Sequence, residues 1–243
     1  MWLLLALCLS ASPAWAISSQ KPAWKQNMKV GIEVGFGTPY GWAITKEDIK
    51  EKGRGLNKIQ VSPNWRFGTV WGYGFPCLDD TLAIGPDIGL FLGTKRKCEI
   101  FFRCGANITL KEQYLHVPLA LKLATFDKET GVQEGGLILG YEFNILLSSE
   151  CSSSSGRLSA EHKAMLEQAN DIKNASKLGG SIFLGGKIDL LEGCYFMGQF
   201  KFPITDFLGL KEDDEVKSCF HAARVACASL VELSLGFNIM KWL

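Results

Sequence analysis

The last fifteen residues of the chain, Ser229–Leu243 (SLVELSLGFNIMKWL), alternate between apolar and polar side chains. Successive side chains of a β-strand point to opposite faces, so this two-residue period predicts a strand with one apolar and one polar face. The apolar face carries Leu233, Leu235, Phe237, Ile239 and Leu243, and the polar face carries Glu232, Ser234, Gly236, Asn238 and Met240. Lys241 is the exception on the apolar face, close to the end, where a long amine can reach water.

Seven earlier stretches repeat this pattern, at residues 29–38, 58–75, 81–93, 112–125, 134–147, 177–190 and 194–204. The connections alternate in length, with long ones at 39–57, 94–110, 148–176 and 205–228 and short ones at 76–80, 126–133 and 191–193. The longest connection also predicts one short surface helix, with Ser159 as its N-cap. After the N-terminus no run approaches the roughly 18 apolar residues of a membrane helix, so a membrane protein of this sequence would cross with strands.

The period alone does not decide which face points inward. In a soluble lipocalin-like barrel the apolar face lines the interior and the charged face meets water. Here glycines crowd the polar face, where they would weaken a solvated strand but suit a narrow interior. They are Gly31, Gly35, Gly37, Gly68, Gly72, Gly74, Gly85, Gly89, Gly136, Gly140, Gly179, Gly185 and Gly236.

The charges on the polar face are sparse and nearly balanced in sign, whereas a solvated face would carry more lysine and glutamate. They are Glu33, Arg66, Asp87, Lys122, Glu142, Lys187, Asp189, Lys201 and Glu232. The opposite face is large, aliphatic and edged with Trp, Tyr and Phe, as a lipid-facing band with aromatic girdles requires. We therefore expect the nine charges to face inward, as a network of ion pairs or as the lining of a pore. The network is favoured, because eight strands leave little free interior.

These features predict an all-β fold, an eight-stranded antiparallel up-and-down transmembrane β-barrel over residues 29–243. It would have short periplasmic turns, long outer loops and one short loop helix. In hydrocarbon every backbone polar group must be paired within the protein, so strands can span a membrane only as a closed ring. The expected location is the outer membrane of a Gram-negative-type bacterium. The expected partners are the lipid bilayer and the outer-membrane assembly machinery.

The chain begins with the apolar segment MWLLLALCLSASPAWA, residues 1–16. An apolar run that leads to an A-x-A motif, here Ala14 to Ala16, is typical of a signal peptide and predicts cleavage after Ala16. Residues 17–28 would then form an N-terminal periplasmic segment. No Lys or Arg precedes the apolar run, and the alternative interpretation is a buried N-terminal strand or helix.

Seven cysteines follow the predicted cleavage site, and an odd number leaves at least one without an intramolecular partner. Two close pairs, Cys98 with Cys104 and Cys219 with Cys227, are candidate disulfides, because an exported protein lies in an oxidising compartment. The alternative is that all seven are free thiols. Neither pair has the spacing of a zinc site, and we expect no metal and no other cofactor.

Three stretches resemble strands of small outer-membrane β-barrel proteins of the porin-like superfamily, in the group named for the Bacteroidetes gliding and secretion protein PorT. Residues 114–122 (YLHVPLALK) resemble that group's YLEIPLLLK strand, residues 137–150 (LILGYEFNILLSSE) look like its glycine-led strand before a long loop, and residues 233–239 (LSLGFNI) look like its final strand. The resemblance implies an OmpA-type eight-stranded barrel with no shared catalytic residues. Such barrels usually end in an aromatic residue, whereas this chain ends Trp242-Leu243.

Three classes of function were compared with the sequence. The first is a barrel that acts through its outer loops as a structural, adhesion or interaction protein, with an extracellular or host partner. The second is a narrow porin. The third, an enzyme, is disfavoured because the mature chain has only His116, His162 and His221 and no G-x-S-x-G, H-E-x-x-H or phosphate-binding glycine motif. The net charge of +1 and the lack of a basic stripe argue against nucleic acid.

Overall fold

The structure, a computed structural model, describes residues 28–39, 56–77, 82–102, 107–126, 133–153, 178–191, 193–204 and 230–241. The predicted signal peptide with its cleavage site after Ala16, the loop helix that begins near Ser159 and the whole 205–228 connection lie outside these ranges. No helix in the described ranges is long and apolar enough to cross a membrane.

Eleven strands and one 3-10 helix make up the described residues. They are β1 (Met28–Pro39), β2 (Leu56–Val61), β3 (Asn64–Tyr73), β4 (Phe75–Cys77), β5 (Leu82–Gly93), β6 (Arg96–Phe102), β7 (Asn107–Phe126), β8 (Gln133–Ser153), β9 (Leu178–Leu191), β10 (Cys194–Pro203), β11 (Leu230–Asn238) and the 3-10 helix η2 (Ile239–Lys241).

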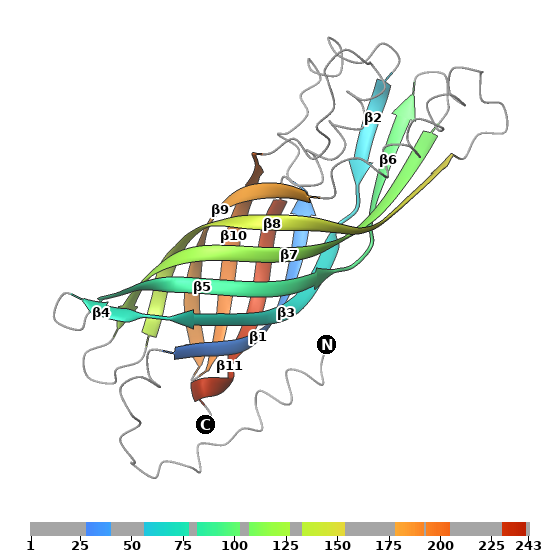
Figure 1. Cartoon of the computed structure of the whole chain (residues 1–243). Coiled ribbons are helices and arrows are strands. Elements are labelled where there is room, and N and C mark those ends of the chain that lie inside the picture. The colour runs from blue at the N-terminus through green and yellow to red at the C-terminus, as the bar shows by residue number, and fades with distance from the viewer. Residues whose placement is uncertain are drawn as a thin grey trace.

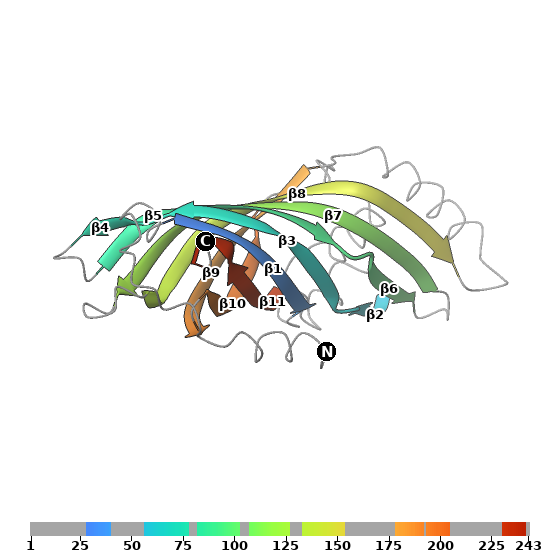
Figure 2. The same ribbon diagram turned by 90° about the horizontal axis from the view of Figure 1, so that it is seen from below.

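Eight of the described strands pair in a closed cycle. Its order is β1, β3, β5, β7, β8, β9, β10, β11 and back to β1, and every pairing is antiparallel. In Figure 1, β5, β7 and β8 form the near wall and β9, β10 and β11 the far wall, and Figure 2 shows the same two walls after a turn of 90°. The predicted all-β antiparallel class is confirmed, and the arrangement is β-barrel-like.

Strands β2 and β6 and the ends of β7 and β8 continue beyond one end of the ring. β2 pairs with β6, β6 pairs with the start of β7, and residues 108–113 of β7 pair with residues 148–153 of β8. We call this four-stranded part the projecting sheet (Figure 1). Its junction with the ring lies at a register shift between Gln113 and Tyr114. Such bulges are common at the rims of barrels.

The strand bounds in the structure correct three sequence predictions. The predicted connection 94–110 contains β6 and the start of β7, and the predicted strand 58–75 is divided into β2, β3 and β4. The first division falls at Ser62 and Pro63, since proline has no N–H to continue a ladder. The last predicted strand ends at Asn238 and continues as η2. Charged residues in β6 were interpreted as a loop, although they alternate with apolar ones.

The two faces of the ring differ sharply in chemistry. Side chains that point outward are apolar and exposed, such as Leu137 at 61% and Ile188 at 60%. Below the junction, every charged side chain in the described part of the ring lies on the inward face. This is the reverse of a soluble barrel with an apolar interior.

Candidate functional site

Ten charged side chains meet inside the ring in the described part of the chain. Five are cations and five are carboxylates, so the ionised group is neutral as a whole. All are buried except Asp189, whose side chain is 10% exposed. They are Lys29, Glu33, Arg66, Asp87, Lys122, Glu142, Lys187, Asp189, Lys201 and Glu232. The structure places all nine of the predicted inward charges in this group, and Lys29 is the tenth.

The closed cycle of strands brings together charges that are far apart in sequence. Arg66 on β3 donates from Nη1 to Oε2 of Glu142 on β8 over 2.8 Å. Strands β5 and β7 separate β3 from β8 in one direction around the ring, so this ion pair crosses the interior. Side chains rather than open space therefore fill the ring at this level.

Arg66, Glu33, Glu142, Glu232 and Lys201 form what we call the arginine cluster. Nη2 of Arg66 lies 2.5 Å from Oε1 of Glu232 and 3.4 Å from Oε1 of Glu33. Nζ of Lys201 lies 2.6 Å from Oε2 of Glu142 and 3.0 Å from Oε2 of Glu232. Two cations thus hold three carboxylates, and Glu33 depends on Arg66 for its one ion pair among the described residues.

Polar side chains on neighbouring strands also bind the carboxylate oxygens of this cluster. Nε2 of Gln199 donates to Oε1 of Glu232 over 2.6 Å. Nδ1 of His116 lies 3.2 Å from Oε1 of Glu142 and 2.5 Å from Oδ1 of Asn144. Buried carboxylates need such partners, because an unpaired one would cost several kcal/mol. The imidazole of His116 thus belongs to a structural network.

Lys29, Asp87, Lys122, Lys187 and Asp189 form a second group, the lysine–aspartate cluster, nearer the short-turn end of the ring. Asp87 lies between two ammonium groups, with Oδ2 3.2 Å from Nζ of Lys29 and Oδ1 3.4 Å from Nζ of Lys122. Nζ of Lys187 lies 2.8 Å from Oδ1 of Asp189. This cluster carries one more cation than anions, and the arginine cluster carries one more anion than cations.

Tyr195 on β10 connects the two clusters. Its hydroxyl donates to Oε2 of Glu33 over 2.9 Å, and the Nζ atoms of Lys29 and Lys187 each lie 4.4 Å from its ring centroid. Such cation–π contacts stabilise buried ammonium groups. Its cross-strand partner is Gly236, where an added Cβ would come within 2.1 Å of the tyrosine ring. A glycine on the inward face thus makes room for a large side chain.

Replacing Tyr195 with phenylalanine should lower the free energy of unfolding by about 1.5–3 kcal/mol, because Glu33 loses a hydrogen bond to a charged group. Urea unfolding followed by tryptophan fluorescence measures this change. Tyr141→Phe is the control, since Tyr141 packs on Phe143 at the outward face, and its effect should stay within about 0.5 kcal/mol. Equal effects of the two substitutions would contradict the role of the Tyr195 hydroxyl.

One wall of the interior carries an apolar group. Ile138, Phe183 and Met197 are buried together with Ala120 beside them. Ile138 is the cross-strand partner of Lys122, and Phe183 is that of Lys201, so the group lies along both ionic clusters. It shields the ion pairs from water on that side, which strengthens them.

Sequence reasoning missed several members of this interior. Lys29 falls on the polar face by its period, yet it is not among the nine charges predicted to face inward. Phe91 interrupts the polar side of the predicted strand 81–93, yet the guanidinium of Arg66 lies 4.1 Å from its ring centroid, and Phe91 is buried. An aromatic residue on an otherwise polar inward face was the available signal for a stacked cation.

The candidate disulfides stay predictions. Cys98 is buried on β6, while Cys104, Cys219 and Cys227 lie outside the described residues. His162 and His221 also lie outside them. Across the described ranges, no group of three or more His, Cys, Asp or Glu side chains is placed to hold a metal ion.

Comparison with known proteins adds no assignment to this site. The chain matches no family model and no curated protein. The resemblance of three short strands to the PorT-like group therefore stays an expectation.

Proposed function

We propose that the protein is an integral outer-membrane β-barrel with a side-chain-filled interior, which acts through its outer loops as a structural, adhesion or interaction protein. The observation that supports it best is the reversal of the two faces, with apolar side chains exposed around the ring and charges inside. Soluble monomers rarely expose contiguous apolar patches larger than a few hundred Å². An exposed apolar band around the whole ring is instead what a barrel surrounded by lipid requires.

The height of the apolar face also fits a bilayer. On β8 the outward apolar residues run from Leu137 to Leu147. At about 3.3 Å per residue and a tilt of about 40°, these residues span about 25 Å along the ring axis, which matches the apolar band of transmembrane barrels. Exposed Trp65 lies toward the loop end of this band, and exposed Trp71 and Phe75 lie toward the short-turn end. Aromatic girdles occupy these two levels in such barrels.

The interior network favours a closed barrel over the second candidate, a narrow porin. Pore-lining charges would need free space and water around them, whereas these charges bind one another across the ring. In planar bilayers the reconstituted protein should therefore give no stable single-channel current. Regular ohmic current steps in symmetric salt would contradict the closed barrel and support the narrow porin.

Partner binding in this proposal belongs to the loop side of the ring. The described strand ends Pro39, Pro203 and Leu230, which flank the long connections 39–57 and 205–228, lie at the same end of the ring as the projecting sheet. A rigid ring with variable connections is a common arrangement for carrying binding residues. An extracellular or host partner would approach from this side.

Heat-modifiability tests the proposal directly. The full-length protein in lipid vesicles should migrate differently on a gel before and after boiling, because a closed ring of strands resists the detergent until heated. It should also stay in the membrane pellet after an alkaline carbonate wash. A single mobility together with release into the supernatant would identify a peripheral or soluble protein.

A further inference from the structure

The two faces of the sheet exchange character at the junction between the ring and the projecting sheet. On β7 the outward face changes from Leu115 in the ring to Lys111 in the projecting sheet, and on β8 it changes from Leu147 to Glu150. On the inward side, the buried cross-strand pair Arg96 and Glu112 lies next to the junction, and the inward residues beyond this pair are apolar and buried. They are Cys98, Ile100, Ile108 and Leu110. In the proposed barrel, this exchange marks the level where hydrocarbon ends and the polar headgroups begin.

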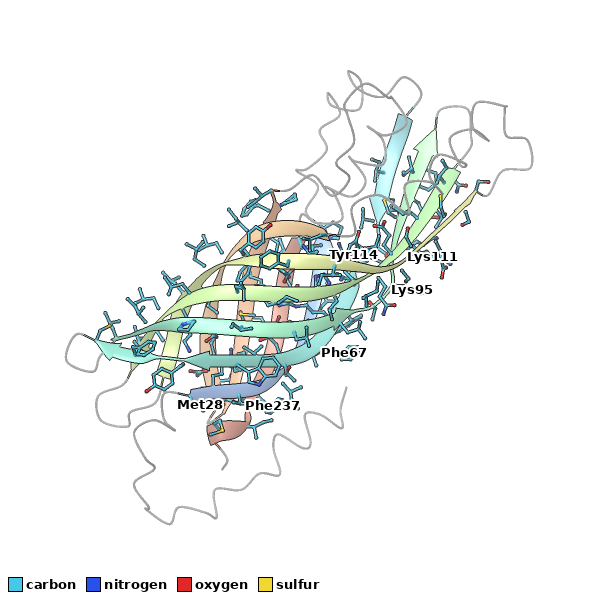
Figure 3. All side chains as sticks on the ribbon, viewed as in Figure 1. Met28, Phe67, Lys95, Lys111, Tyr114 and Phe237 are labelled. Carbon is cyan, nitrogen blue, oxygen red and sulfur yellow. The ribbon has the colours of Figure 1, made fainter. Side chains whose placement is uncertain are left out.

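Three lysines lie on the outward side just above that level. Lys111 is four residues beyond Leu115, which at about 3.3 Å per residue and a tilt of about 40° places its backbone about 10 Å above the apolar band. The headgroup region adds about 5–8 Å to each side of the hydrocarbon, and a lysine side chain can reach back into it. Figure 3 shows Lys95 and Lys111 close together at the junction.

The strand register sets two of these lysines side by side. Lys97 on β6 is the direct cross-strand partner of Lys111 on β7. Like charges directly opposite each other destabilise a sheet unless something compensates them, and on its other side Lys111 has Glu150 of β8 as its cross-strand partner. The side chains of Lys95 and Lys97 are 49% and 46% exposed, so an outside anion can reach them.

Among the residues that the structure describes, the carboxylates nearby do not balance the three lysines. Glu150 pairs with Lys95, and Glu99 pairs with Lys97, with Oε1 of Glu99 2.8 Å from the ammonium nitrogen. Lys111 forms no ion pair with any residue that the structure describes. Within the described ranges, the charge of Lys111 thus stays unbalanced, between the ion-paired Lys97 on β6 and the ion-paired Glu150 on β8.

We propose that Lys95, Lys97 and Lys111 bind the phosphate of an anionic lipid headgroup in the leaflet on the loop side. Ammonium groups attract anionic lipid at a membrane surface. The acyl chains of that lipid would lie below, against outward apolar residues such as Phe67 and Leu115. This inference rests on the proposed membrane barrel and adds one lipid class to it.

Trp65 provides a built-in reporter for this lipid. It is exposed, and its backbone pairs with Thr94, the residue before Lys95, through bonds of 2.8 and 3.0 Å. The full-length protein is placed in phosphatidylcholine nanodiscs that contain phosphatidic acid brominated in its acyl chains. The quenching of Trp65 is the difference between the protein and its Trp65→Phe variant. Brominated phosphatidylcholine gives the reference.

The expected result is a preference of Trp65 for phosphatidic acid over phosphatidylcholine. Lys111→Gln should weaken that preference about fivefold, the size of the attraction between one surface lysine and an anionic leaflet. Lys97→Gln should weaken it similarly. Glu99→Gln is the matched control of opposite sign, because it releases Lys97 and should strengthen the preference.

Each other outcome has a distinct meaning. An unchanged preference in all three variants, with quenching by brominated phosphatidylcholine intact, overturns the lysine site but leaves the barrel. Loss of quenching by both lipids overturns the proposed function itself. If inorganic phosphate abolishes the preference while chloride at equal ionic strength does not, the lysines bind free phosphate, and the lipid assignment is wrong. Unboiled mobility on a gel checks that every variant is folded.

Discussion

Replacing Arg66 with methionine should lower the free energy of unfolding by about 3–5 kcal/mol, because breaking a buried ion-pair network leaves carboxylates buried without a cation. Arg66 contacts three carboxylates, Glu33, Glu142 and Glu232. Methionine fills similar volume without charge, so the loss comes from electrostatics rather than from a cavity. Urea unfolding of the protein in lipid vesicles, followed by tryptophan fluorescence, measures it.

Loss of the Arg66 guanidinium should affect the three carboxylates to different extents. Glu142 and Glu232 keep Lys201 at 2.6 and 3.0 Å, whereas Glu33 keeps only the hydroxyl of Tyr195 among its described partners. Glu33→Gln should therefore recover part of the lost stability in the Arg66→Met protein, although it destabilises the unsubstituted one. A double-mutant cycle gives the coupling energy, expected to be in the range of about 0.5–3 kcal/mol.

Strict additivity of Arg66→Met and Glu33→Gln would contradict this account of the arginine cluster. Lys187→Met is a useful comparison, since Lys187 has one ion pair with a described residue, the partly exposed Asp189. Its cost should be smaller than that of Arg66→Met, because water can reach the abandoned carboxylate. A larger cost at Lys187 would move the centre of the interior network to the lysine–aspartate cluster.

The two-residue period carried most of the fold. It separates inward from outward residues because a strand alternates strictly, and Glu33, Lys122 and Glu232 all follow it. It also predicted which face of the strands points into the ring. Glycines opposite large inward side chains, such as Gly236 beside Tyr195, belong to a crowded interior. A local pattern was sufficient for these features.

The contacts across the interior could not be predicted in the same way. That Arg66 meets Glu142 depends on the number of strands between them and on the stagger of each pairing. A shift of two residues in one pairing would keep every side chain on its face and change its partner. The alternation of the strands therefore predicted which charged residues face the interior, and the structure showed which of them form ion pairs.

The projecting sheet was missed because its pattern is reversed relative to the ring. Residues 97–100 alternate as regularly as a ring strand, yet they put Lys97 and Glu99 outward and Cys98 and Ile100 inward. Strands of the ring carry apolar residues outward and charged residues inward. Under that rule, Lys97 and Glu99 indicate a solvated connection rather than a strand. The bulge at Gln113 and Tyr114 lies at the boundary between the pattern of the ring and the reversed pattern of the projecting sheet.

Replacing Leu119 with arginine should destabilise the protein by about 2–4 kcal/mol, the cost of a charge on the lipid face at the bilayer midplane. Leu119 lies midway along the outward apolar residues of β7, which run from Leu115 to Leu123, and it is 41% exposed. At an equally exposed site in water, such a change would usually stay within about 0.5 kcal/mol. The same urea unfolding in vesicles measures the difference.

Leu123→Arg is the matched control for Leu119→Arg. Leu123 is 39% exposed, lies on the same strand and the same face, and differs only in its distance from the centre of the band. Near the interface the cost of arginine should fall to about 0–1 kcal/mol, because the guanidinium can reach the headgroups. If the face meets water, arginine should cost the same stability at both positions. If it meets lipid, the cost should depend on the depth of each position in the bilayer. Equal and small effects at Leu119 and Leu123 would therefore show that the apolar face meets water or another protein, and the membrane assignment would fall.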